Sequence, residues 1–117
     1  GDGMSSTGDV LATDPLSTLR MVKRVIGSKM ESAQDRGFEV EANVCRRAIQ
    51  RLDEYEVRME DLDQRRADAL IHKDNAEANR IFNTMADCRD TVFRAIHVDL
   101  LLSKNELRSI GIASSWA

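Results

Sequence analysis

Apolar side chains recur every three or four positions along most of this chain, a spacing that places them on one face of an α-helix. The pattern predicts helices over residues 15–36, 39–73 and 75–102, and a short final helix over 104–110. Residues 1–14 are polar and acidic and lack this period, so we expect a disordered acidic tail there. The chain is therefore predicted to be all-α, with a single helical domain over residues 15–117.

Local signals mark the ends of the expected helices. Asp14 can cap a helix whose first position is Pro15, where the missing N–H of proline costs nothing. Gly37 is a suitable residue to end this helix. Asp74 and Ser103 are each followed three residues later by Glu, a pattern that resembles the capping box of a helix start.

The two central helices carry an apolar stripe with the rhythm of a coiled-coil seam. They are predicted to form a long antiparallel hairpin that turns near residue 74, so that residue n faces roughly residue 148 − n. One unbroken helix over 39–102, about 95 Å long, is the alternative. The hairpin is favoured because a lone helix would leave its stripe exposed. The residues expected in the seam, within the core or between copies of a homo-oligomer, are Ile49, Leu52, Met59, Leu62, Ile81, Met85 and Val92.

Composition fits this picture of long solvated helices. Only 4% of the 117 residues are aromatic, 32% are charged, and proline occurs once. No run of 18 apolar residues occurs, so we expect no membrane span. The N-terminal residues lack the basic and then apolar pattern of a signal peptide, and we expect a cytoplasmic protein, in the host cytoplasm if it is viral.

Residues that carry chemistry are scattered. In the expected hairpin register Cys88 faces Met59 rather than Cys45, so a disulfide is not expected. His97 faces Arg51, far from His72, and no metal-ligand spacing is present. There is no glycine-rich phosphate loop and no plausible serine–histidine–aspartate set. We therefore expect no catalytic residues, no metal, no cofactor, no small-molecule substrate and no enzymatic activity.

One enzymatic alternative rests on four polar residues of the second helix. Small helical chorismate mutases line a helical bundle with Arg, Lys, Glu and Gln side chains. The residues that imitate such a lining are Arg46, Arg47, Gln50 and Arg51. Exposed arginines are common on coiled coils, so this alternative ranks below a non-enzymatic role.

Positive charge gathers in the first helix of a chain whose net charge is −3. Arg20, Lys23 and Arg24 are three and four positions apart and share one helix face. Such a face can contact the phosphates of nucleic acid. It can equally pack near the acidic second helix or remain solvated. These two interpretations are favoured, because charged helix faces are most often simply solvated.

The segment Asp99–Ile112, which reads DLLLSKNELRSIGI, resembles the end of some phage terminase small subunits. The opening from Asp14 into a basic helix and the central charged hairpin are similar in organisation. The resemblance implies an oligomeric, often ring-shaped subunit that recognises double-stranded DNA in a viral genome-packaging complex. It implies no ATPase activity in this chain, a large ATPase subunit as partner, and phosphate contacts from Arg20, Lys23 and Arg24.

A different hypothesis follows from the helical pattern alone. A charged helical hairpin with a thin core is also typical of a helical adaptor or chaperone that binds another protein through its hairpin. This hypothesis predicts no affinity for DNA and an apolar groove that needs a partner.

Overall fold

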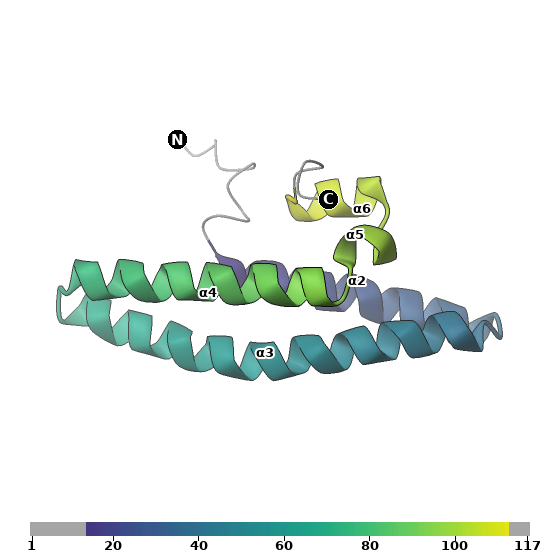
Figure 1. Cartoon of the computed structure of the whole chain (residues 1–117), viewed down its shortest axis with the longest axis horizontal. Helices are drawn as coiled ribbons and strands as arrows, with labels where there is room; N and C mark the ends of the chain where they lie inside the picture. Colours follow the sequence, from purple (N-terminus) through teal and green to yellow (C-terminus); the bar gives the residue numbers. More distant parts are fainter. Residues whose placement is uncertain (1–13, 113–117) are drawn as a thin grey trace.

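The computed structural model describes residues 14–112. These residues form the helices α2 (Pro15–Asp35), α3 (Glu39–Ile71), α4 (Asn75–Ala95), α5 (Val98–Leu101) and α6 (Lys104–Ile110) (Figure 1). Within this described part of the chain there is no strand, and the all-α prediction is confirmed. The expected tail, apart from Asp14, lies outside the described residues.

The long helix α3 is shared by two antiparallel hairpins. It packs against α4, as predicted, and also against α2, while α2 and α4 contact each other (Figure 1). The guanidinium of Arg66 lies over the ring of Phe82, 5.1 Å from its centroid, a pair that satisfies the expected register of the α3–α4 hairpin. The described chain is elongated, with extents of 52 × 29 × 20 Å. Because α2 contacts both α3 and α4, the first helix is an integral part of the bundle.

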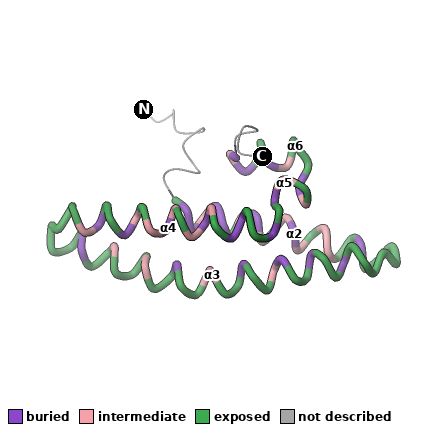
Figure 2. The backbone as a smooth tube through the Cα atoms, viewed as in Figure 1, coloured by how far each residue is buried: buried purple, intermediate pink, exposed green. Residues whose placement is uncertain are grey.

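The core lies where the three long helices contact one another. Purple, buried positions form the inner faces of α2, α3 and α4, whereas much of the outer face of α3 is exposed (Figure 2). The hydrophobic core residues that are 0% exposed are Leu19, Val22, Ile26, Leu52, Met59, Val92, Phe93 and Val98. All seven residues of the expected seam belong to this core or pack against it: Ile49, Leu52, Met59, Leu62, Ile81, Met85 and Val92. Within one chain they bury each other.

The starts of α2, α4 and α6 are capped by the side chains expected to cap them. Asp14 accepts a hydrogen bond from the backbone N–H of Ser17, and Asp74 accepts one from the N–H of Glu77, both at 3.2 Å. Ser103 forms a reciprocal capping box, in which its hydroxyl accepts from the Glu106 N–H and Glu106 accepts from the Ser103 N–H. These bonds satisfy donors that the first turn of a helix leaves unpaired.

Four of the helices are followed within two residues by a residue in the left-handed conformation. Gly37 and Gly111 take this conformation without the strain that a Cβ causes, whereas Lys73 (φ 60°) and His97 (φ 56°) adopt it as non-glycine residues. The first two helices end within two residues of their expected positions, at Asp35 and Ile71.

The helix expected over residues 75–102 is shorter than predicted, and this boundary was wrong. It ends at Ala95, and the left-handed residue His97 separates it from α5. The physical reason is burial: Val98 and Leu102 both turn into the core, and Leu102 is extended just before the capped start of α6. No glycine or proline marks this break in the sequence.

The turns that follow α2 and α3 have the same hydrogen bonds. The N–H of Phe38 donates to Ala33 O at 2.8 Å, and the N–H of Asp74 donates to Ala69 O, also at 2.8 Å. Each turn is flanked by two buried alanines, which allow the helices to approach closely; these are Ala33 and Ala42, and Ala69 and Ala78. The matching residues are 36 positions apart, like Gly37 and Lys73. No internal repeat beyond the heptad spacing was expected from the sequence, but the structure shows that these two turns repeat one another.

Candidate functional site: a basic groove beside α3

The basic face expected on α2 is largely joined to α3. Arg20 donates from Nε to Glu56 Oε2 at 2.7 Å and from Nη2 to Glu60 Oε2 at 2.6 Å. Lys23 Nζ lies 2.6 Å from Asp53 Oδ1 and 2.8 Å from Glu56 Oε1. Glu56 therefore lies between two cations at the α2–α3 interface. One interpretation of the sequence was that the basic helix packs near the acidic second helix, and the structure shows this packing.

The ionisation of these groups reflects their proximity. Hydrogen bonds from Lys23 and Arg20 hold the pKa of Glu56 below its ordinary value. The hydrogen bond to Glu56 raises the pKa of Arg20, and the hydrogen bonds to Asp53 and Glu56 raise that of Lys23. The charge of two residues of the predicted DNA-binding face is therefore compensated within the chain. The third, Arg24, is exposed and has no side-chain partner among the described residues.

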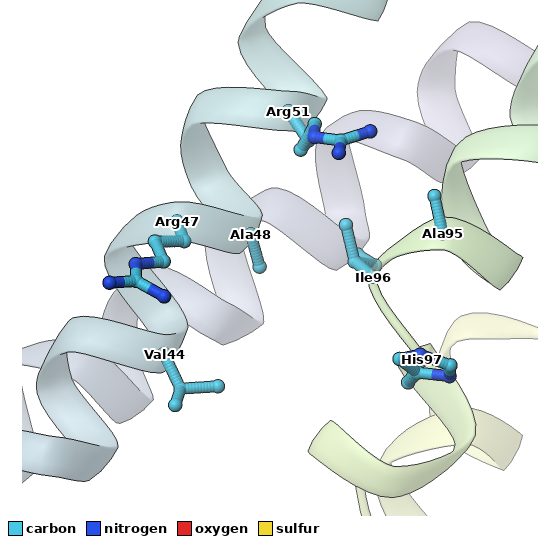
Figure 3. A pocket seen from close by; sticks show the side chains of 7 residues that line it. All are labelled: Val44, Arg47, Ala48, Arg51, Ala95, Ile96 and His97. Carbon is cyan, nitrogen blue, oxygen red and sulfur yellow. The ribbon is translucent and has the colours of Figure 1, made fainter.

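A second basic cluster lies between α3 and the end of α4. A pocket of 380 Å³ opens there, and we call it the basic groove (Figure 3). Its wall on α3 is formed by Val44, Arg47, Ala48 and Arg51, and its opposite wall by Ala95, Ile96 and His97. Ala48 and Ile96 are buried and form an apolar floor, while the two arginines and the histidine are exposed at the rim.

Helix geometry explains why these side chains meet. Val44, Ala48 and Arg51 are four and three positions apart on α3, so they lie along one face. The opposite wall is the end of α4, where Ala95, Ile96 and His97 lie across from α3 just as the chain leaves the helical path (Figure 3). Arg51 and His97 line the same pocket, as the hairpin register predicts.

The electrostatics of the groove differ from those of the α2 face. Among residues 14–112, no Asp or Glu lines the groove. In the part of the chain that the structure describes, the side chains of Arg47 and Arg51 form no ion pair and no hydrogen bond. Unpaired guanidinium groups beside an apolar floor suit a ligand that has both apolar and anionic groups, because guanidinium binds carboxylate or phosphate with two parallel hydrogen bonds.

The four residues of the mutase alternative do not form one site. Arg47 and Arg51 line the basic groove, but Arg46 lines a separate hollow near Gly37 and donates a hydrogen bond to Asn43. All four side chains are exposed rather than directed into the bundle, Gln50 among them. This placement offers no enclosed lining of the kind that the alternative requires.

The remaining polar candidates lie apart from the groove. Cys45 is buried, and burial raises the pKa of its thiol; Cys88 is half-buried, and both are free thiols. His72 Nδ1 lies 2.8 Å from the carbonyl oxygen of Asp68 at the end of α3, and in the tautomer with a proton on Nδ1 it donates a hydrogen bond to that oxygen. Among residues 14–112 no cluster of His, Cys, Asp or Glu is arranged to hold a metal ion. None of the helices in this range combines the length and apolarity that a membrane span requires.

Sequence reasoning missed the groove as a site, although one signal was available. The α3 stripe that packs on α4 continues towards the helix N-terminus through Arg51, Ala48 and Val44, with the same spacing of three and four. Val44 is nevertheless 45% exposed, as Val40 is 80% exposed, because the described chain does not cover them. An apolar stripe that outlasts its partner helix is the feature that could have identified this surface.

Comparison with known proteins gives a distant similarity. No family model matches the chain, and no solved structure does. The uncharacterized protein C40H1.3 of Caenorhabditis elegans is 23% identical over 114 residues, which are 97% of this chain and 23% of that protein. The chain thus spans about a quarter of the length of this relative. The name of that protein assigns it no activity.

Proposed function

We propose that this chain is a non-enzymatic helical adaptor that binds a partner protein in the basic groove. The observation that carries the proposal is the pairing of an apolar floor with Arg47 and Arg51, which have no partner in the described chain. Buried apolar contacts supply affinity in such grooves, and rim charges select the partner and its orientation. The remainder of the fold serves as a rigid support, because α2 and α4 fix α3 from two sides.

Site-specific photo-crosslinking tests this function. A photoreactive phenylalanine analogue at Val44 is expected to crosslink a discrete protein in an extract of the source cells, because this half-exposed side chain lines the groove. Mass spectrometry then identifies the protein and the crosslinked peptide. The matched control carries the same analogue at Asn83, an exposed position on α4 that does not line the groove.

The double variant Arg47→Glu/Arg51→Glu provides the second comparison. The crosslink at Val44 is expected to weaken severalfold in this background, since both arginines are exposed and their reversal leaves the core intact. Equal crosslinking from Val44 and Asn83, or no protein crosslinked at Val44, would show that the groove is not a protein-binding site.

DNA recognition of the terminase small subunit type remains the other candidate and rests on the sequence resemblance. It requires Arg20, Lys23 and Arg24 to contact phosphates, yet two of these residues already donate to carboxylates of α3. For this reason the geometry supports partner binding better. The wild-type chain separates the two candidates: the adaptor is expected to show no salt-dependent shift of a labelled DNA duplex, whereas DNA recognition predicts an affinity that falls steeply with salt.

A further inference from the structure

The basic groove lies on the continuation of the surface that binds α4. Leu62, Arg66 and Ala69 of α3 face α4, as the stacking of Arg66 on Phe82 illustrates. Steps of three and four residues lead from them back along α3 through Tyr55 to Arg51, Ala48 and Val44. A helix that continued the line of α4 would therefore lie on the floor of the groove.

The chain itself does not continue along this line. After Ala95 it turns at the left-handed residue His97, and α6 packs against α2, where Lys29 Nζ lies 3.1 Å from Glu106 Oε1. The N-terminal part of α3 is thus paired with α2 on one face, while no helix among the described residues covers Val40 and Val44 on the face in line with α4. The open face is most exposed at Val40 and Val44.

We propose that an acidic amphipathic helix of the partner protein occupies this open face of α3 and completes a three-helix arrangement with α2 and α3. This inference rests on the function proposed above and specifies the partner's chemistry. The open face from Val40 to Arg51 is about 17 Å long, which corresponds to about three turns of helix. The occupant takes the place of the missing continuation of α4.

The lining residues define what this helix carries. Small and apolar side chains at Val44, Ala48 and Ile96 accept apolar anchors that are three or four positions apart on the partner, as in helix-in-groove recognition. Arg47 and Arg51 lie on successive turns of α3 and match two carboxylates on successive turns of the partner. The absence of any acidic residue from the groove lining disfavours a basic helix.

Designed peptides test the inference directly. The probes are fluorescent, alanine-based helical peptides of about 15 residues with two leucine anchors four positions apart. One peptide carries glutamates beside the leucines, and its partner carries lysines at the same positions. Fluorescence anisotropy with the full chain is expected to give at least about tenfold tighter binding of the glutamate peptide, because only its charges complement the groove.

The variant Arg47→Glu/Arg51→Glu is expected to reverse this preference and to bind the lysine peptide more tightly. Reversal rather than simple loss separates charge recognition from damage to the fold. The control Arg24→Glu/Arg108→Glu makes the same change in net charge at exposed positions outside the groove and is expected to keep the original preference. Circular dichroism verifies that each variant is helical.

Each other outcome overturns a defined statement. Equal binding of both peptides, or binding of neither, refutes the acidic-helix inference; a groove-specific crosslink at Val44 obtained in parallel would leave the adaptor function standing. Self-association of the wild-type chain in analytical ultracentrifugation that is lost in Arg47→Glu/Arg51→Glu would assign the groove to a second copy and would also overturn the inference. Failure of both the peptides and the crosslink would remove the adaptor function as well.

Discussion

Replacing Leu52 with alanine is expected to lower the free energy of unfolding by about 2–5 kcal/mol. Leu52 has no exposed surface and lies on α3 in the core shared with α2 and α4. Truncation removes buried methyl groups and leaves a cavity that three packed helices cannot easily close. Urea denaturation followed by circular dichroism measures the change.

Val57→Ala is the matched control for this substitution. Val57 is an aliphatic residue of the same helix but is 69% exposed, so its truncation is expected to change stability by no more than about 0.5 kcal/mol. A similar loss in both variants would mean that the effect comes from the helix itself. A negligible loss for Leu52→Ala would contradict the placement of this residue at the centre of the core.

Changing Glu56 to lysine is expected to cost about 2 kcal/mol of stability, because breaking a largely buried pair costs more than losing an exposed one. The Glu56 side chain is only 16% exposed and receives hydrogen bonds from Arg20 and Lys23. A lysine there would leave three cations close together at the α2–α3 interface. The control Glu54→Lys changes an exposed neighbour without an ion pair in the described chain, and it should remain within about 0.5 kcal/mol in the same urea denaturation experiment.

The same residue predicts how stability depends on pH. Because the folded-state pKa of Glu56 lies below its ordinary value of 4.5, its contribution is complete above that pH and is lost as pH falls through the lower folded value. Glu56→Gln should therefore flatten, but not abolish, the acid limb of a stability profile. Some slope remains because the pKa of Glu106 is also lowered: burial opposes its ionisation, but the Ser103 N–H and Lys29 outweigh this effect. An unchanged acid limb in Glu56→Gln would exclude this role.

Much of the fold could be predicted because short-range signals agree with the long-range pattern. Asp14, Asp74 and Ser103 cap helices in the structure as their spacing to the following residues indicates. The period of the apolar stripe fixed the face of α3 that meets α4, and a short connection left only an antiparallel arrangement. The Arg66–Phe82 contact agrees with the register derived from these two facts.

The end of α4 could not be predicted, because its cause is not local. Residues 96–102 contain no glycine or proline, and their apolar side chains continue the helical period. The break depends instead on tertiary packing, since Val98 and Leu102 become buried only when the chain turns them into the core. The break ends α4 beside Arg51 and leaves the N-terminal part of α3 without this neighbour, so the shape of the basic groove depends on a turn that no residue type marks in the sequence. The spacing of Arg47 and Arg51 suits other chemistry equally well, and Val44 alone indicates only a stripe.

The role of α2 was open for a related reason. Arg20 and Lys23 have the spacing of a phosphate-binding face, but the same spacing serves an interface with acidic residues of another helix. Sequence alone does not specify which helix lies opposite. The structure places Glu56 and Asp53 there, and this placement decides how far their charge is available to an external ligand.

The two matching turns, 36 residues apart, indicate how this architecture grows. Each turn reverses the chain and returns a helix along the previous one, so helix, turn and helix together act as a building unit whose last helix is the first of the next. An arrangement of antiparallel helices joined by such turns can be extended by a further turn and helix without changes in the helices already present. The turn at His97 is followed by a helix of only four residues. The repetition of long helices therefore stops at α4, and the position that a next long helix would occupy beside α3 is available to another molecule.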